Sequence, residues 1–292
     1  MEKWSSSVTQ KPRFYARARV LKRTFFVALP FFLVLLFGFL SYLPVFNIAT
    51  IELVGATIVK QSEVTHVVEP LLATPIKGIF SRRNVLLYPK SEIERALKKE
   101  LPRLASVHVR VGEKRELIVD VTERKASSLW CGKEPLSETN ELLTECYYID
   151  KDAILFARAP YFSGSVYMKW YGPISDELDP LGTQYLDKDK FHSLESVVNG
   201  MENLGITPLA LVPKKNGEYE LWLDPGLDRT NGLIPRMLFG SEIPFAKVVS
   251  DFSVALANPP LKDRFKAEYG KLEYIDLRFL NKVYYKFTKT DK

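Results

Sequence analysis

The feature that most constrains this chain is an uninterrupted apolar run near its N-terminus. Residues 25–43 read FFVALPFFLVLLFGFLSYL, and no charged residue occurs between Thr24 and Ile51. A helix needs roughly 20 such residues to cross a hydrocarbon layer of about 30 Å. Pro30 and Gly38 weaken a helix in water but are tolerated in lipid. We therefore predict a single N-terminal transmembrane helix over residues 25–46.

The positive charge is concentrated just before that run. Residues 1–24 carry seven bases and one acid, which accounts for the whole net charge of +6, so the rest of the chain is neutral. A nucleic-acid-binding domain carries its positive charge on a folded face, so we expect no nucleic-acid partner. Basic residues flank membrane helices on the cytoplasmic side. The prediction is a basic cytoplasmic tail over residues 1–24, with the bulk of the chain outside the cytoplasm.

A cleaved signal peptide is the competing interpretation of the apolar run. The apolar core of a signal peptide spans about 7–15 residues and precedes a cleavage site of small residues. Here the run is longer, and no clear small-x-small site follows it. These two differences favour an uncleaved anchor.

Two cysteines, Cys131 and Cys146, lie in the predicted exported part. An even number of cysteines outside the cytoplasm is typical of disulfide-bonded proteins. The alternative is a catalytic thiol, which needs a histidine beside it in space. No histidine lies close to either cysteine in the sequence. The pattern favours the disulfide, and spatial pairing of a thiol with a histidine stays open.

Residues 47–125 have the hydrophobic pattern of one β-α-α-β-β module. Ser91 and Glu94 have the spacing of a capping box at the start of its second helix. Two helices on one face of a three-stranded sheet bury the apolar stripes. The predicted elements are a strand over 48–54, helices over 60–72 and after Ser91, and strands over 107–111 and 117–121.

Residues 126–288 predict a second, β-rich domain with two helices. The helical stripes span residues 190–204 and 243–257. The domain ends in a hairpin, because the alternating runs 272–279 and 282–288 are separated only by Leu280 and Asn281. Residues 289–292 are predicted to be a frayed tail. The fold class is therefore α+β.

Enzymatic motifs are missing from the sequence. The three histidines, His66, His108 and His192, lack metal-ligand spacing, and there is no G-x-S-x-G, P-loop or G-x-G-x-x-G string. Three aromatic residues, Trp130, Trp170 and Trp222, suit strand packing better than a glycan-binding groove. We expect no catalytic residue, no cofactor and no metal.

Four strings, in order along the chain, resemble the FtsQ/DivIB family of bacterial division proteins, whose β-α-α-β-β module is the POTRA fold. They are IELVG at 51–55, VDVTERK at 119–125, YIDKDAILF at 148–156 and LEYIDLRF at 272–279. Lys125 and Ala126 stand where the family usually has a small residue or proline, and Ala153 stands where it has glycine. Cys131, Cys146 and the insertion-like segment 136–144 depart from the family pattern.

The resemblance implies a POTRA domain over 47–125 and an FtsQ-type β domain over 126–288. It implies a non-enzymatic scaffold of the divisome, held in the bacterial cytoplasmic membrane and gathered at the division septum. Such a scaffold recruits bitopic partners like FtsB and FtsL, and contacts other division components through the POTRA module. The family binds FtsB by strand addition on the last strand. That surface corresponds here to Phe279, Asn281, Lys282, Val283, Tyr284 and Tyr285.

The last strand is a reasonable binding edge on physical grounds too. A terminal strand at a sheet edge offers unpaired N–H and C=O groups to a partner strand. The alternative is that Lys282 and Lys286 only protect the edge against aggregation. In the same way Lys77, Arg82 and Arg83 are either a solvated basic loop or a partner-binding part of the POTRA module.

Two other functions stay open at the level of sequence. An anchored extracytoplasmic enzyme acting on the cell wall needs carboxylates that are paired only in space. A POTRA-type chaperone of protein export usually carries several POTRA modules and a barrel of many strands, which the single module does not suit.

Overall fold

The computed structural model describes the backbone of residues 13–135, 145–162, 166–226 and 233–288, with side chains from residue 25 onwards. The insertion at 136–144, the predicted frayed tail and the side chains of the predicted basic tail lie outside the described residues. The chain divides between Glu123 and Arg124 into two compact units.

The first unit begins with helix α1 (Arg13–Ser41), whose described side chains over residues 25–37 are all exposed. The helix was expected to continue to residue 46 but ends at Ser41. Leu43 is extended before Pro44, as a residue preceding proline tends to be, and a separate 3-10 turn follows at Pro44–Phe46. Within the described residues, no helix is both long enough and apolar enough to cross a membrane. The membrane anchor therefore stays a prediction.

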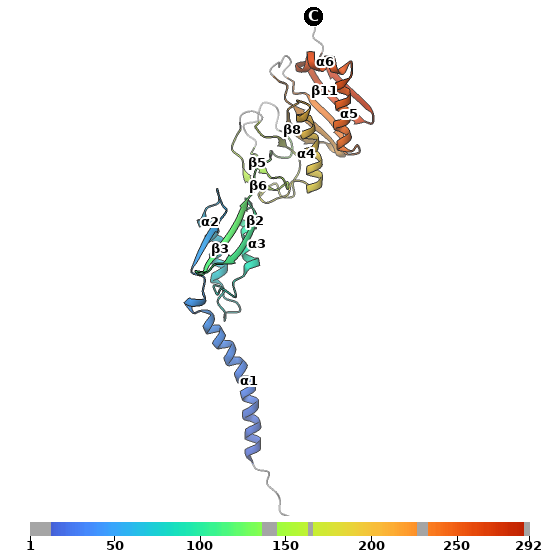
Figure 1. Ribbon diagram of the computed structural model, residues 1–292. Helices are drawn as coiled ribbons and strands as arrows, with labels where there is room; N and C mark the ends of the chain where they lie inside the picture. Colours follow the sequence, from blue (N-terminus) through green and yellow to red (C-terminus); the bar gives the residue numbers. More distant parts are fainter. Residues whose placement is uncertain (1–12, 136–144, 163–165, 227–232, 289–292) are drawn as a thin grey trace, which may run out of the picture. The chain divides into compact units, whose positions relative to one another are not determined.

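The module of the first unit has the predicted β-α-α-β-β order (Figure 1). Central β3 pairs with β1 in parallel and with β2 in antiparallel orientation. The buried residues of both helices pack with those of the three strands in one core. The elements are β1 (Thr50–Val54), α2 (Gln61–Ala73), α3 (Lys90–Glu100), β2 (Leu104–Val111) and β3 (Glu116–Glu123).

The predicted capping box at Ser91 was wrong. Helix α3 begins at Lys90, directly after Pro89, and Glu94 instead accepts a hydrogen bond from the backbone N–H of Val109 at 3.0 Å. Glu94 thus connects α3 to β2 rather than capping its own helix. At the start of the other helix of this module, α2, the backbone N–H of Lys60 does donate a hydrogen bond to the Glu63 carboxylate, at 2.7 Å.

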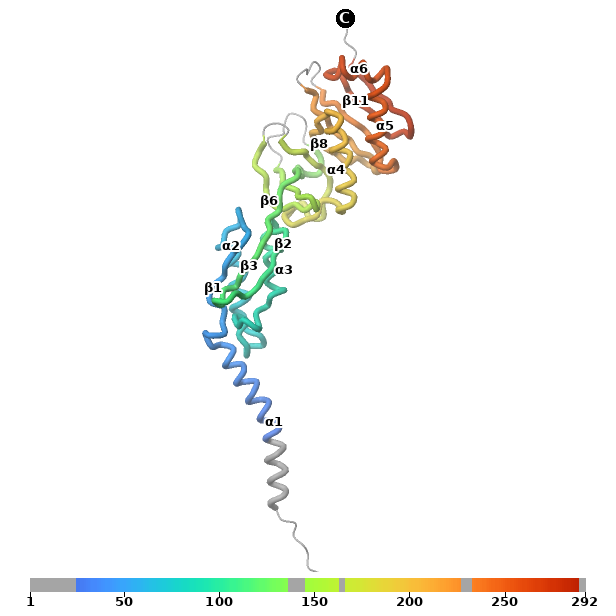
Figure 2. The backbone as a smooth tube through the Cα atoms, viewed as in Figure 1, coloured from blue at the N-terminus to red at the C-terminus, as the bar shows by residue number. Residues whose placement is uncertain are grey.

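The second unit is built on a mixed sheet, which in the described residues has nine strands in the order β12-β11-β10-β9-β8-β7-β4-β5-β6. Helices α4 (Lys188–Asn203) and α5 (Phe245–Ala257) pack against each other beside this sheet (Figure 2). The strands are β4 (Ser128–Trp130), β5 (Tyr147–Ile149), β6 (Leu155–Arg158), β7 (Lys169–Trp170), β8 (Pro208–Pro213), β9 (Glu218–Leu223), β10 (Arg236–Gly240), β11 (Leu272–Phe279) and β12 (Lys282–Phe287).

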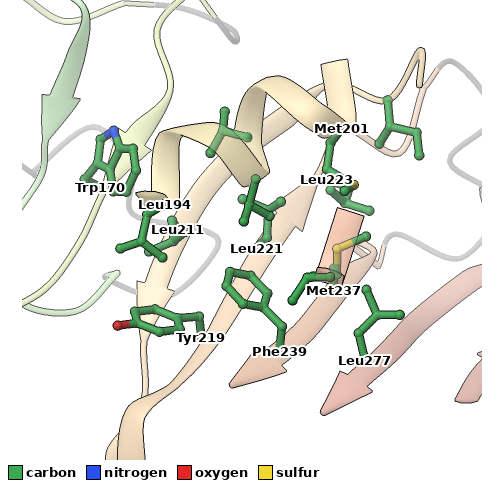
Figure 3. Close-up of a cluster of buried hydrophobic side chains, with 14 of the residues drawn as sticks. Trp170, Leu194, Met201, Leu211, Tyr219, Leu221, Leu223, Met237, Phe239 and Leu277 are labelled. Carbon is green, nitrogen blue, oxygen red and sulfur yellow. The ribbon is translucent and has the colours of Figure 1, made fainter. Parts of the chain in front are cut away.

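The main core of this unit lies between the sheet and its helices. Figure 3 shows Leu194 and Met201 of α4 over Leu211, Leu221 and Leu223 of the strands below, all of them buried. The core continues to β10 and β11 through further buried side chains. These include Met237, Phe239 and Leu277.

The second unit has a helix that the sequence did not predict, α6 (Leu261–Glu268). Only one of its residues, Leu261, is fully buried, while Phe265 and the following Tyr269 pack partly against the core. A helix of two turns with so few apolar positions leaves too short a stripe for periodicity to detect.

Cys131 and Cys146 form a disulfide bond, as the sequence favoured. Cys131 directly follows β4 and Cys146 directly precedes β5, its antiparallel neighbour. The bond therefore closes the β4–β5 hairpin at its loop end. Neither sulfur is available as a free thiol.

Candidate functional site

The strand β12 occupies one edge of the nine-stranded sheet, with β11 as its neighbour. Leu280 and Asn281 make the turn between the two strands, and Asn281 adopts a left-handed conformation with φ of 59°. Asparagine is one of the few residues that tolerate this conformation, which explains its place in a tight turn. Since β12 has no strand on its other side among the described residues, its backbone is open to pairing there.

Side chains of β12 alternate between the core and the solvent. Val283, Tyr285 and Phe287 pack against the main core, whereas Lys282, Tyr284 and Lys286 are exposed. The Tyr284 side chain is 50% exposed and stands edge-on to Phe279, with ring centroids 5.2 Å apart. An exposed aromatic pair thus lies at the turn end of the free edge.

The structure separates the six predicted contact residues into two groups. Phe279, Lys282 and Tyr284 lie exposed at the edge, and Asn281 shapes the turn beside them. Val283 and Tyr285 are half-buried against the core, so their side chains are largely committed. These two side chains are therefore not free to contact a partner strand.

One of the two lysines that could protect the edge is engaged. Lys286 contacts the Glu273 carboxylate on β11 at 2.6 Å, and this hydrogen bond raises the pKa of the lysine. The lysine therefore remains charged at neutral pH. Lys282 lies at the turn end of the strand and is exposed.

The sheet face opposite the helices continues from this edge, and sequence reasoning did not identify it. Register places Tyr284 beside Asp276, then Leu238, then Glu220. The next row runs from Lys286 through Tyr274 and Arg236 to Trp222. The Arg236 guanidinium lies 5.3 Å from the centre of the Trp222 ring. The only available sequence signal was the alternation of these half-buried residues with buried ones in β9 and β10.

An ion-pair network stiffens the end of β11 beside this face. Asp276 and Arg278 lie two residues apart, so their side chains share one face of the strand. The Arg278 guanidinium contacts Asp276 at 2.6 and 2.9 Å and reaches Glu218 of β9 at 3.1 Å. Burial raises the pKa of Asp276, but hydrogen bonds and charge from Arg278 outweigh it, so the pKa lies below its ordinary value. Asp276 is therefore ionised and fixed at neutral pH.

A pocket of 390 Å³ opens at the same end of the sheet. Glu218, Arg278 and Leu280 border it, together with the turn that follows β10. The pocket joins charged groups to an apolar side chain directly beside the β11–β12 turn.

Other sequence candidates lie elsewhere. Trp130 and Trp170 are buried in the main core, which excludes them from an open glycan groove. His192 on α4 contacts Glu195 at 3.0 Å, and His66 and His108 lie on α2 and β2. No group of three or more His, Cys, Asp or Glu side chains within the described ranges is arranged to hold a metal ion. Arg82 and Arg83 are paired with Glu92 and Glu69.

No protein-family model matches the chain, and no curated protein is significantly similar to it.

Proposed function

We propose that this protein is a membrane-anchored, non-enzymatic scaffold that binds an extended segment of a partner protein as an additional strand on β12. One observation carries the proposal: β12 lies at an edge of the sheet and presents Lys282 and Tyr284 to solvent, beside the exposed Phe279 at the end of β11. Strand addition supplies affinity through main-chain hydrogen bonds and specificity through alternate side chains. Exposed tyrosine is a frequent source of binding energy at interfaces.

The resemblance to the FtsQ/DivIB family supports a role in the bacterial divisome. Three of the sequence strings that resemble this family contain residues with a clear structural role in this chain. Gly55 ends β1 in a left-handed conformation, Glu123 binds the loop after β1, and Asp276 and Arg278 form the ion pair of β11. In this proposal the partners are FtsB- and FtsL-like bitopic proteins, and the POTRA module contacts further components at the septum.

The proposed topology has an anchor at α1, the N-terminus in the cytoplasm and both units outside. The positive charge before the apolar run supports this orientation. The disulfide between Cys131 and Cys146 suits an oxidising compartment outside the cytoplasm.

Two neighbouring proline substitutions test the strand-addition step. Successive N–H groups of a strand point to opposite sides, so one of Val283 and Tyr284 donates toward β11 and the other toward the free edge. Val283→Pro and Tyr284→Pro should therefore differ: one destabilises the hairpin, and the other keeps the fold but loses a hydrogen bond to the partner. Binding of the host's FtsB-like extracytoplasmic segment is measured by titration, and stability by thermal unfolding. Wild-type affinity in both folded variants would contradict the model.

A side-chain substitution has a matched control in the same unit. Tyr284→Ala should weaken binding about tenfold or more, because it removes an exposed aromatic anchor. Tyr161→Ala removes a tyrosine of similar exposure, 59% against 50%, from the loop after β6 at the opposite edge of the sheet. The control should bind like the wild type, and equal losses in both variants would place the interface elsewhere.

The cellular role is tested by imaging the full-length protein with a fluorescent tag at its N-terminus in its own host. A band at midcell in dividing cells is the expected result. A uniform envelope signal throughout the cycle would contradict the divisome role, while leaving strand addition to be judged by the titrations.

A further inference from the structure

We infer that the α2–α3 loop, residues 74–89, rests in the outer interface of the lipid bilayer and acts as a second membrane contact of the first unit. This inference depends on the proposed membrane anchor. Figure 2 shows the chain returning between α2 and α3 to the end of α1. The backbone N–H of Ser81 donates to the Ser41 hydroxyl at 3.0 Å, and the Asn84 amide donates to the Ser41 carbonyl at 3.4 Å. Loop and helix end are thus packed together.

The connection between α1 and the module is held on two sides. Ile48 donates its backbone N–H to the Arg83 carbonyl at 2.8 Å, and Val85 donates to the Phe46 carbonyl at 2.9 Å. From the β2–β3 turn, the Arg115 guanidinium donates to the Pro44 carbonyl. A linker tied in this way fixes the height of the loop along α1.

Gly38 sets that height. A Cβ added to Gly38 would lie 2.8 Å from Cγ2 of Ile79 and 3.2 Å from the Ile79 carbonyl oxygen, so the loop touches the helix backbone there. Gly38 precedes the last helical residue, Ser41, by less than one turn, or about 5 Å along the axis. It also lies inside the apolar run of residues 25–43. If that run lies in lipid, Ile79 is at the level of the headgroups or below.

The exposed side chains of the loop suit lipid better than water. Leu86 is 87% exposed at the tip of a turn that Asn84 holds in place, since its side chain accepts from the N–H of Leu86 and its carbonyl from that of Leu87. Ile79 and Leu87 are also exposed, as are Val45 and Phe46 just beyond α1. Apolar side chains gathered around the end of one apolar helix mark an interfacial surface.

Charge agrees with an anionic surface. Lys77 projects from the tight turn between Ile76 and Phe80 and makes no ion pair with any described residue, in contrast to Arg82 and Arg83. A lysine close to anionic headgroups gains binding free energy that salt screens.

The test uses environment-sensitive fluorophores on the full chain in vesicles of phosphatidylcholine, with and without phosphatidylglycerol. An introduced cysteine is the only free thiol, because Cys131 and Cys146 are bonded to each other. Probes at Leu86→Cys and Ile79→Cys should show blue-shifted emission and quenching by doxyl-labelled lipid. The matched control is Ile58→Cys, 61% exposed in the loop after β1, which should show neither. Lys77→Gln should reduce quenching at Leu86→Cys only in the anionic vesicles.

A probe at Phe39→Cys in α1 separates the two proposals, since Phe39 is 69% exposed on the helix itself. If this probe is quenched while Leu86→Cys and Ile79→Cys behave like Ile58→Cys, the loop inference is wrong and the anchor stands. If Phe39→Cys also stays in water, the anchor itself is wrong, and the loop inference falls with it.

Discussion

At the scale of single residues, Glu123 is the clearest case of a polar group that holds distant parts of the first unit together. Its carboxylate accepts backbone hydrogen bonds from Thr57, Ile58 and Val59, at 3.2, 2.9 and 2.7 Å. Burial raises the pKa of Glu123, but these hydrogen bonds and the charge of Arg103 outweigh it, so the pKa lies below its ordinary value. Glu123→Gln should lower the free energy of unfolding by about 1–3 kcal/mol at neutral pH.

The sign of the pH dependence follows from the direction of that shift. A carboxyl with a lowered folded pKa contributes its full stability above its unfolded pKa, and loses it as the pH falls through the folded value. The gap between wild type and Glu123→Gln should therefore be widest at neutral pH and narrow below about pH 4. Thermal unfolding in detergent at pH 7 and pH 3 measures it, and a gap that stays constant would contradict the assigned role.

A substitution of Gly55 tests whether the backbone conformation at the end of β1 requires glycine. Its φ is +86°, and a Cβ there would lie 2.3 Å from the Val121 carbonyl oxygen. Gly55→Ala should destabilise the first unit by at least ~2 kcal/mol, since strain and collision act together. Gly78→Ala is the matched control, because Gly78 has φ of +73° but open space around it, and should cost about 1 kcal/mol. Equal losses in thermal unfolding would mean that the contact with Val121 is unimportant.

Residues such as these show what the sequence can and cannot reveal. Gly55, Glu123 and Asp276 all stand in strings that the sequence singled out, yet their partners lie up to 66 positions away. The sequence strings therefore identify which residues matter. Only the fold shows that Glu123 accepts hydrogen bonds from three backbone N–H groups and that Arg278 contacts Glu218. The contact between Gly38 and Ile79 had no sequence signal beyond a glycine in an apolar helix.

At the scale of elements, alternation and helical stripes located the three strands of the first unit, the final hairpin and the longer helices, because each buries one regular face. They failed for α6, whose apolar stripe is too short, and for the start of α3, where Pro89 rather than Ser91 precedes the helix. The final hairpin was predicted because only Leu280 and Asn281 separate its two alternating runs, and the structure shows that Asn281 takes the left-handed position of the turn.

The β4–β5 hairpin offers a test at this scale. The disulfide between Cys131 and Cys146 spans 15 positions. In the chain-entropy view, closing such a loop stabilises the folded state by about 3 kcal/mol. Cys131→Ala with Cys146→Ala should lower the stability of the second unit by about 2–3 kcal/mol. Thermal unfolding of the oxidised wild type, the reduced wild type and the double variant checks this, and the last two should agree.

At the scale of the whole molecule, strand order is the part of the fold that pattern alone could not supply. In the second unit, the short strand β7 pairs in parallel with both β4 and β8. It therefore joins strands β4 to β6 to the strands that follow α4. The parallel pairing of β7 depends on long-range packing, which local pattern does not encode. The position of β12 at the edge, on which the proposed function rests, could only be expected from its place at the end of the chain.

The division into two units makes a prediction about how the chain unfolds. Each unit has its own buried core, one around β3 and the other between the nine-stranded sheet and its helices. Calorimetry in detergent should therefore resolve two transitions, with Gly55→Ala lowering one and removal of the disulfide lowering the other. Because the altered sites share no partners, the combined variant should show the sum of the separate changes within about 0.5 kcal/mol. A shift of both transitions by Gly55→Ala alone would show instead that the two units fold as one.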